Sequence, residues 1–353
     1  MRTSVGLALS LAAFAGMAWA ETAAIPDGGP GIAARYVRDG GLASDPRVVF
    51  FDNLEGRSSK LARSGCSVDT TPGRAFDGAG CLLVPHEQGS HKPMAFDLTI
   101  PAGDCYFFRW YAYFPEGYDF GKGEKAPGFH ASAAGVGGGH AGERPNGRDR
   151  FTAKICYGKG GEAHFYYYHM DQKGGYGDIG HQNVGQRVRF ETGQWYCMEL
   201  MVRANDVNLP APNGAMRMWI DGQLRAKVDG IRFRSVNTLT LKAHHSAYFG
   251  GHWTSPKTQS RFEDNFVIAR GYIGPMVKVP PKPRTVVARK MKPAMAPEEA
   301  KRAQQEKEAG RLYQMARQAE RMGQRDVAKR LYGQIVERFA ETSIAEKARA
   351  KID

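Results

Sequence analysis

Residues 151–169 read FTAKICYGKGGEAHFYYYH, two runs of aromatic and β-branched residues joined by a glycine-rich turn. A three-residue loop centred on Gly160 predicts a hairpin in which Thr152 lies opposite Tyr168 and Lys154 lies opposite Tyr166. Because side chains alternate along a strand, one face carries the polar groups Thr152, Lys154, Cys156, His164, Tyr166 and Tyr168. The opposite face is mostly apolar and is predicted to pack against a second sheet: Phe151, Ala153, Ile155, Tyr157, Ala163, Phe165 and Tyr167.

The same kind of segment recurs from about residue 47 to residue 272. Short runs of aromatic and β-branched residues are separated by Gly, Pro, Asn and Asp, and no ten-residue stretch there has helical periodicity. Met216, Met218 and Ile220 alternate along one run, and Asp221-Gly222 after it predicts a tight hairpin turn. We therefore predict an all-β domain over residues 21–275, an antiparallel β-sandwich of the jelly-roll type.

The two ends of the chain differ from this domain. Residues 1–20 place Arg2 before an apolar run that ends in Ala18-Trp19-Ala20, which predicts a cleaved export signal and a secreted or periplasmic protein. Residues 276–297 are a basic, proline-rich linker with no acidic residue. Residues 298–353 have helical spacing, and the part from 309 to 342 resembles a single tetratricopeptide unit. Because one such unit does not bury its apolar face alone, it is expected to dock on the sandwich, self-associate or capture a partner helix. A solvated charged coil is the alternative.

Composition and net charge together exclude some classes of protein and some kinds of binding partner. The chain has 353 residues, 42% of them hydrophobic, and a net charge of +13, which excludes a wholly disordered chain, a collagen and a multi-span membrane protein. Most of the positive excess follows residue 275. Export argues against nucleic acid as its counterpart, so acidic polysaccharide or another anionic polymer is expected, with a plain solubilising linker as the alternative.

Cysteine and histidine spacing gives two further predictions. The five cysteines have no zinc-site spacing, and Cys66 and Cys81, on either side of a turn, are predicted to form a disulfide in an oxidising compartment. His244 and His245 are adjacent and point to opposite faces of a strand, with no carboxylate spaced to join them. We therefore predict neither a metal nor a cofactor.

The polar face of the 151–169 hairpin suits an acidic sugar polymer. Aromatic rings stack on pyranose rings, and lysine pairs with a uronate carboxylate. β-Elimination at a uronic acid needs groups that neutralise the carboxylate, a base for the C5 proton and an acid for the leaving O4. Arg109, His164, Lys242 and His244 are further candidates for binding a substrate carboxylate. The alternative is an aromatic-rich sheet surface with exposed charges and no site.

Over roughly residues 45–273 the chain resembles the family-14 polysaccharide lyases and, more distantly, the family-20 glucuronan lyases. The resembling segments are Gly123 to Gly128 (GEKAPG), Phe151 to Lys154 (FTAK), Tyr166 to Tyr168 (YYY), Tyr248 to Gly251 (YFGG) and Phe262 to Phe266 (FEDNF). The resemblance implies a jelly roll that cleaves alginate or a related polyuronate.

Residue by residue, the resemblance implies a catalytic role for Lys125, Thr152, Lys154, Tyr166 and Tyr168. Thr152 stands where the family has serine, and Lys154 stands where it has arginine, so a two-pronged donor is replaced by a point charge. The sequence thus predicts an exported polyuronate lyase. A noncatalytic carbohydrate-binding or envelope-scaffold protein is the alternative.

Overall fold

The computed structural model describes residues 26–56, 58–93, 95–137, 141–250, 253–278, 297–321 and 324–352. The predicted export signal, most of the linker, and Gly251 of the YFGG segment lie outside these residues. The chain divides into two compact units, Met1–Pro280 and Pro281–Asp353, which are described separately.

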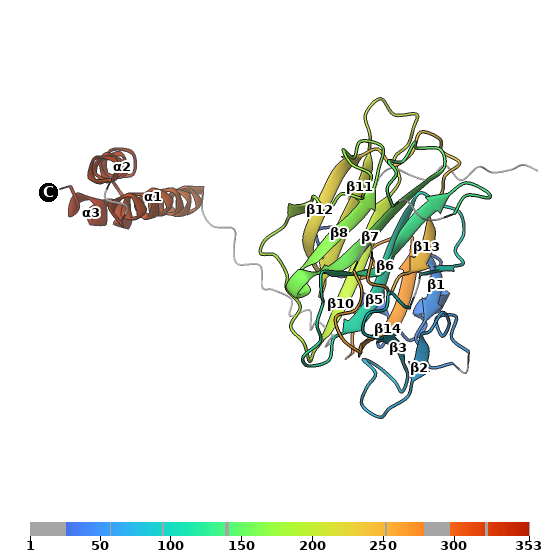
Figure 1. Cartoon of the computed structure of the whole chain (residues 1–353). Coiled ribbons are helices and arrows are strands. Elements are labelled where there is room, and N and C mark those ends of the chain that lie inside the picture. The colour runs from blue at the N-terminus through green and yellow to red at the C-terminus, as the bar shows by residue number, and fades with distance from the viewer. Residues whose placement is uncertain are drawn as a thin grey trace, which may run out of the picture. The chain divides into compact units, whose positions relative to one another are not determined.

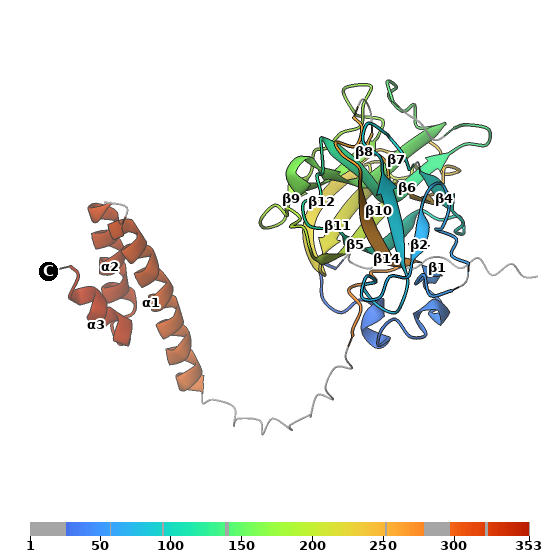
Figure 2. The ribbon, with the colours of Figure 1, turned by 60° about the horizontal axis from the view of Figure 1, so that its bottom comes forward.

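The first unit is a sandwich of two antiparallel sheets (Figure 1 and Figure 2). The larger sheet has the strand order β2-β3-β14-β5-β10-β11-β12-β9, and β1 also pairs with β14. Its strands are β1 (Val48–Asp52), β2 (Ser67–Asp69), β3 (Cys81–His86), β5 (Cys105–Tyr113), β9 (Gln182–Asn183), β10 (Trp195–Arg203), β11 (Gly214–Ile220), β12 (Gln223–Ile231) and β14 (Gln259–Ala269).

The smaller sheet has the order β4-β13-β6-β7-β8. Its strands are β4 (Phe96–Leu98), β6 (Gly123–Ser132), β7 (Arg150–Gly158), β8 (Ala163–Tyr168) and β13 (Lys242–His245). Alternate side chains of both sheets fill one core, as the alternating pattern predicts. Trp110 Nε1 of β5 donates to Tyr157 Oη of β7 at 3.0 Å there, and the ring of Phe108 packs edge to face on Phe129 of β6. The predicted jelly-roll sandwich is confirmed.

The predicted turns are also present. Lys159–Gly161 joins β7 to β8 as a short 3-10 turn, with Gly160 at φ +67°. Asp221 and Gly222 join β11 to β12 with φ values of +52° and +75°, the left-handed pair that a two-residue hairpin of this twist requires.

Arg109 does not lie where the sequence analysis placed it. Its β5 neighbours Phe108 and Trp110 point into the core between the sheets, so Arg109 points to the other side of the larger sheet. There it is fully buried and forms an ion pair with Asp39, and its Nη1 donates to the Gly274 carbonyl at 3.3 Å. The interpretation of Arg109 as a substrate-binding residue was wrong, because the chain before β1 covers it and supplies its counter-charge.

The predicted Cys66–Cys81 disulfide is also absent, since both cysteines are free. In the β2–β3 ladder Asp69 faces Cys81 and Ser67 faces Leu83, which puts Cys66 beside Val84, three residues away from Cys81. Three residues of a strand span about 10 Å, beyond the reach of a disulfide. The alternation also turns the two thiols to opposite faces of the sheet.

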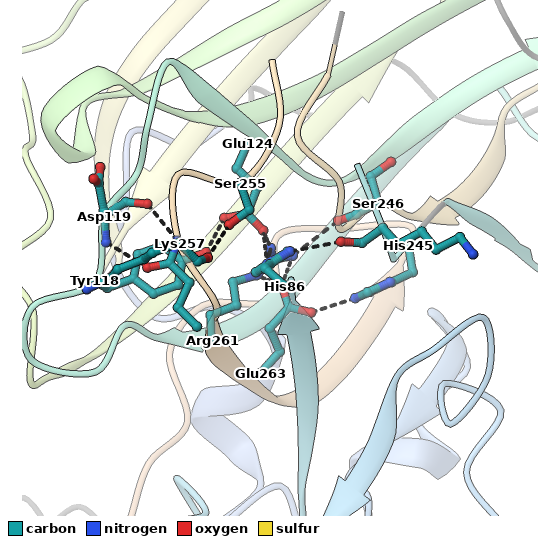
Figure 3. Close-up of polar contacts among 12 residues, drawn as sticks. His86, Tyr118, Asp119, Glu124, His245, Ser246, Ser255, Lys257, Arg261 and Glu263 are labelled. Atoms are coloured by element: carbon teal, nitrogen blue, oxygen red, sulfur yellow. Dashed lines mark hydrogen bonds and ion pairs between the residues drawn. The ribbon is translucent and has the colours of Figure 1, made fainter. Parts of the chain in front are cut away.

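A buried charge cluster ties the two sheets together (Figure 3). Arg261 of β14 forms ion pairs with Glu124 of β6 and with Glu263, the latter at 3.0 Å. His86 Nε2 lies 2.7 Å from Glu124 Oε1, and His245 Nε2 lies 2.5 Å from Glu263 Oε2. Burial raises the pKa of Glu263, but Arg261 and His245 outweigh burial and lower it overall. The Glu263 carboxylate therefore stays ionised inside the protein.

The described part of the second unit, residues 297–321 and 324–352, contains three helices, α1 (Pro297–Arg321), α2 (Arg325–Arg338) and α3 (Ser343–Arg349). Their apolar faces pack on one another around Ala316, Tyr332, Ile335 and Ala345. The helices thus bury apolar surface without a partner, so the physical reason for expecting one is weaker than the sequence suggested. The tetratricopeptide likeness stays a prediction. Among the described residues, no helix has the length and apolar character needed to cross a bilayer.

Candidate active site

The predicted polar face is the outer face of the smaller sheet, meaning the side that points away from the sandwich core. The predicted register of β7 and β8 is confirmed. Residues that face each other across the strands form three rows. The first row is Lys242, His130, Thr152 and Tyr168; the second is Asp97, His244, Gly128, Lys154 and Tyr166; the third is Lys125, Cys156 and His164. All the predicted catalytic and substrate-binding residues except Arg109 lie in these rows.

Two phenol groups meet in the last three residues of β8. Tyr166 Oη and Tyr168 Oη are 3.0 Å apart, and the rings pack edge to face at 5.5 Å between centroids. Burial raises the pKa of Tyr166 well above its usual value, and the hydrogen bond with Tyr168 raises it further. Tyr166 is therefore a neutral phenol at neutral pH and retains the proton that a general acid must donate.

Lys125 reaches this face through an irregularity in β6. The ladder with β7 shifts register between Lys125 and Gly128, so both residues lie on the outer face despite their odd spacing. Lys125 Nζ lies 3.3 Å from the centroid of the Tyr166 ring. Gly250 permits this placement, since a Cβ there would lie 2.7 Å from Lys125 Cε.

Cys156 is a thiol in an unusually charged position. Lys125 Nζ donates to Cys156 Sγ at 3.4 Å, and the thiol is almost fully buried. Burial raises the pKa of Cys156, but Lys125 and a hydrogen bond with His164 outweigh burial and lower the pKa to about 7. Burial also lowers the pKa of His164, but the interaction with Cys156 outweighs burial, so the pKa of His164 is raised overall. The sequence analysis placed Cys156 on this face but gave it no role.

The side chain of Lys154 is buried on the outer face of the smaller sheet. Its neighbour Gly128 leaves room for it, because a Cβ on Gly128 would lie 2.5 Å from Lys154 Cβ. Lys154 Nζ donates to Ser246 Oγ at 3.1 Å and lies 5.6 Å from the Tyr248 ring centroid. Burial and the charge of Lys125 lower the pKa of Lys154 to about 7. Lys154 is thus poised between an ammonium group and a neutral amine near neutral pH.

The opposite edge of the face carries the remaining predicted residues. Lys242 is exposed and its Nζ donates to Ser132 Oγ at 2.9 Å. His244 is buried and its ring stacks on His130 with centroids 5.1 Å apart, while His130 Nε2 lies 2.9 Å from Asp97 Oδ1. Burial lowers the pKa of both imidazoles. Sequence analysis missed His130 and Asp97, although alternation from Gly128 would have placed His130 on this face.

Comparison with known proteins gives one family. Residues 93–266 match the family model described as Polysaccharide lyase 14. No curated protein sequence matches the chain.

Solved structures with a similar fold include three lyases. A marine PL-14 alginate lyase from Aplysia kurodai is 20% identical, with a TM-score of 0.50 over 63% of this chain and 99% of that chain. Alginate lyase vAL-1 from Chlorella virus is 17% identical, with a TM-score of 0.45 over 57% and 88%. An endo-β-1,4-glucuronan lyase from the fungus Trichoderma reesei is 15% identical, with a TM-score of 0.38 over 62% and 90%. At its low identity, the Aplysia likeness establishes the fold alone.

Proposed function

Since residues 93–266 of the β-sandwich match the family model described as Polysaccharide lyase 14, we propose that this protein cleaves a polyuronate such as alginate or glucuronan by β-elimination. The observation that carries the proposal is the outer face of the smaller sheet, where two amines flank two phenol groups whose oxygens are 3.0 Å apart. Amines bind and neutralise the uronate carboxylate, and phenols move protons. Both are needed at the same sugar.

In the proposed reaction, Lys125 and Lys154 hold the carboxylate and stabilise the charge that develops when the C5 proton leaves. Tyr168, which enters the step as a phenolate and accepts the hydrogen bond from Tyr166, takes that proton as base. The electrons of the C5–H bond form the C4=C5 double bond while the C4–O4 bond breaks, and Tyr166 gives its proton to O4. Proton transfer between the two phenol oxygens then restores Tyr166. No oxidant or further reactant is needed.

The two departures from the family pattern fit this role. Thr152 is 6% exposed and lies in its row between His130 and Tyr168, so its extra methyl group packs inside the sheet surface. Lys154 offers one charge where a guanidinium would offer two parallel hydrogen bonds. A carboxylate held by Lys154 alone would be free to turn, and Lys125 supplies the second point of contact.

The test is incubation of the protein with alginate, glucuronan and other acidic glycans while the ultraviolet absorbance of unsaturated uronates is followed. We expect absorbance to rise with at least one polyuronate. The matched control is the Tyr166→Phe, Tyr168→Phe double variant, which keeps both rings and is expected to be inactive. Binding of a polyuronate without any rise in absorbance would instead support the noncatalytic carbohydrate-binding alternative and would refute the lyase proposal.

Export is part of the proposal. The apolar run that ends in Ala18-Trp19-Ala20 has the pattern of a cleaved signal, and a polymer substrate is met outside the cytoplasm. Fractionation of cells that produce the full chain tests this. We expect the protein in the periplasm or medium with Glu21 at its N-terminus, and an uncleaved chain retained inside the cell would contradict export.

A further inference from the structure

Two imidazoles and a carboxylate meet at one edge of the outer face, where β4, β13 and β6 lie side by side. His244 of β13 faces Asp97 of β4 on one side and Gly128 of β6 on the other, and His130 lies two residues beyond Gly128. One candidate ligand atom from each of Asp97, His130 and His244 lies within 4.8 Å of the other two. Because the three residues come from three paired strands, the sheet ladder fixes their separations.

The two imidazoles have unmet bonding capacity. His244 is 7% exposed, and its buried Nε2 has no hydrogen-bond partner among the described residues; the same holds for Nδ1 of His130. The rings stack with an angle of 20° between their planes. Buried polar groups are nearly always paired. The unpaired Nε2 of His244, on a ring stacked against that of His130, therefore points to a ligand bound beside the His130 Nε2–Asp97 Oδ1 pair, whose atoms are 2.9 Å apart.

The types of side-chain atom at this cluster indicate which metal ion would bind there. Imidazole nitrogens with a carboxylate oxygen suit zinc and similar transition-metal dications, whereas magnesium and calcium prefer oxygen ligands. Three protein ligands are the usual number at a zinc ion that keeps one position open for water or an anion. We propose that Asp97, His130 and His244 bind a zinc-type dication at the edge of the outer face.

Metal binding at this edge of the sheet does not depend on the lyase activity. A bound dication beside Thr152 and Lys154 would add a positive group that holds a further carboxylate of an acidic polymer. The site itself depends only on the three side chains, and so its test measures metal binding.

The test is calorimetric titration of zinc chloride into the full chain, purified without a histidine tag and stripped of metal with a chelator. We expect one zinc ion per chain. His244→Ala and His130→Ala should each weaken binding by at least about 100-fold, since loss of even an outer partner of a metal ligand costs roughly 10- to 100-fold. Asp97→Asn, at a side chain that is 60% exposed, tests the carboxylate with little risk to folding.

The matched control is His169→Ala. His169 also pairs with a carboxylate, with its Nε2 2.8 Å from Asp178 Oδ2, but it belongs to no cluster of three ligands among the described residues. Zinc affinity should not change in this variant. Failure of the parent chain to bind one zinc ion would overturn the proposal. It would also be overturned if the His244→Ala, His130→Ala and Asp97→Asn variants, each shown by circular dichroism to be folded, bound zinc with the same affinity as the parent chain.

Discussion

The pairing of Lys125 with Cys156 leads to a quantitative prediction. Lys125 Nζ lies 3.4 Å from Cys156 Sγ, in a position from which water is almost excluded. Its charge, together with a hydrogen bond from His164, brings the pKa of Cys156 down to about 7 against the effect of burial. Lys125→Met removes the charge and keeps most of the side-chain volume. We expect the thiol of this variant to stay protonated at neutral pH.

The size of the shift follows from the distance. Two unit charges 3.4 Å apart attract by roughly 5 kcal/mol at an effective dielectric constant of about 20, which corresponds to between three and four pKa units as an upper bound. Opposite charges at such distances shift measured values by about one to three units. The pKa of Cys156 should therefore rise from about 7 to roughly 8–10 in Lys125→Met.

The assay is a pH titration of thiolate absorbance in the ultraviolet, with Cys156→Ser subtracted as the blank. The other cysteines provide an internal control, because burial raises the pKa of Cys66, Cys81 and Cys197 to about 12 and that of Cys105 to about 11. They should stay protonated across the neutral range. A parent thiol that does not ionise below pH 9, or an unchanged titration in Lys125→Met, would refute the assigned role of the lysine.

Three other predictions concern activity and stability. Tyr166→Phe keeps the ring beside Lys125 and loses the proton donor, so kcat on a polyuronate should fall by about 10²- to 10⁴-fold in initial-rate assays. Gly128→Ala places a Cβ 2.5 Å from Lys154 Cβ; the resulting strain should lower the free energy of unfolding by about 1–3 kcal/mol in urea and reduce activity. Arg261→Met leaves buried carboxylates without a counter-charge and should cost about 3–5 kcal/mol in the same urea assay.

Each of these variants has a matched control. Tyr167→Phe lies one residue away and loses a hydrogen bond to the Gly180 carbonyl on the core side, so it should keep its activity; an equal loss there would contradict the role of Tyr166. Gly137→Ala adds a Cβ with nothing within 4 Å and should change neither quantity. Arg187→Met breaks an exposed ion pair with Glu162 and should cost less than about 1 kcal/mol.

Local pattern was enough to predict the central hairpin. The alternation of Thr152, Lys154 and Cys156 with core residues fixes which side chains share a face, and Gly160 fixes where the chain turns. The prediction worked because register and alternation are short-range properties. Lys125 is a different case. Alternation alone would turn it away from Gly128, and only the shift in the β6 ladder brings both residues to the outer face.

Long-range packing could not be predicted in the same way. Arg109 looked like an exposed charge in an aromatic strand, but its partner Asp39 comes from 70 residues earlier in the chain. Asp97 and His130 come together only because β13 lies between β4 and β6, and no spacing in the sequence reports that order. The Cys66–Cys81 disulfide was wrong for the same reason, since a pairing register decides which residues can touch.

Glu124 and Lys125 are neighbours that point in opposite directions, one into the charge cluster between the sheets and the other onto the reactive surface. One peptide bond therefore joins a residue of the buried charge cluster, Glu124, to a residue of the outer face, Lys125. We expect a substitution of Arg261 or Glu263 that is selected for heat tolerance to change the turnover rate as well, even though neither side chain contacts the polymer. Adaptation of this protein to a new temperature and adaptation to a new substrate are not independent problems.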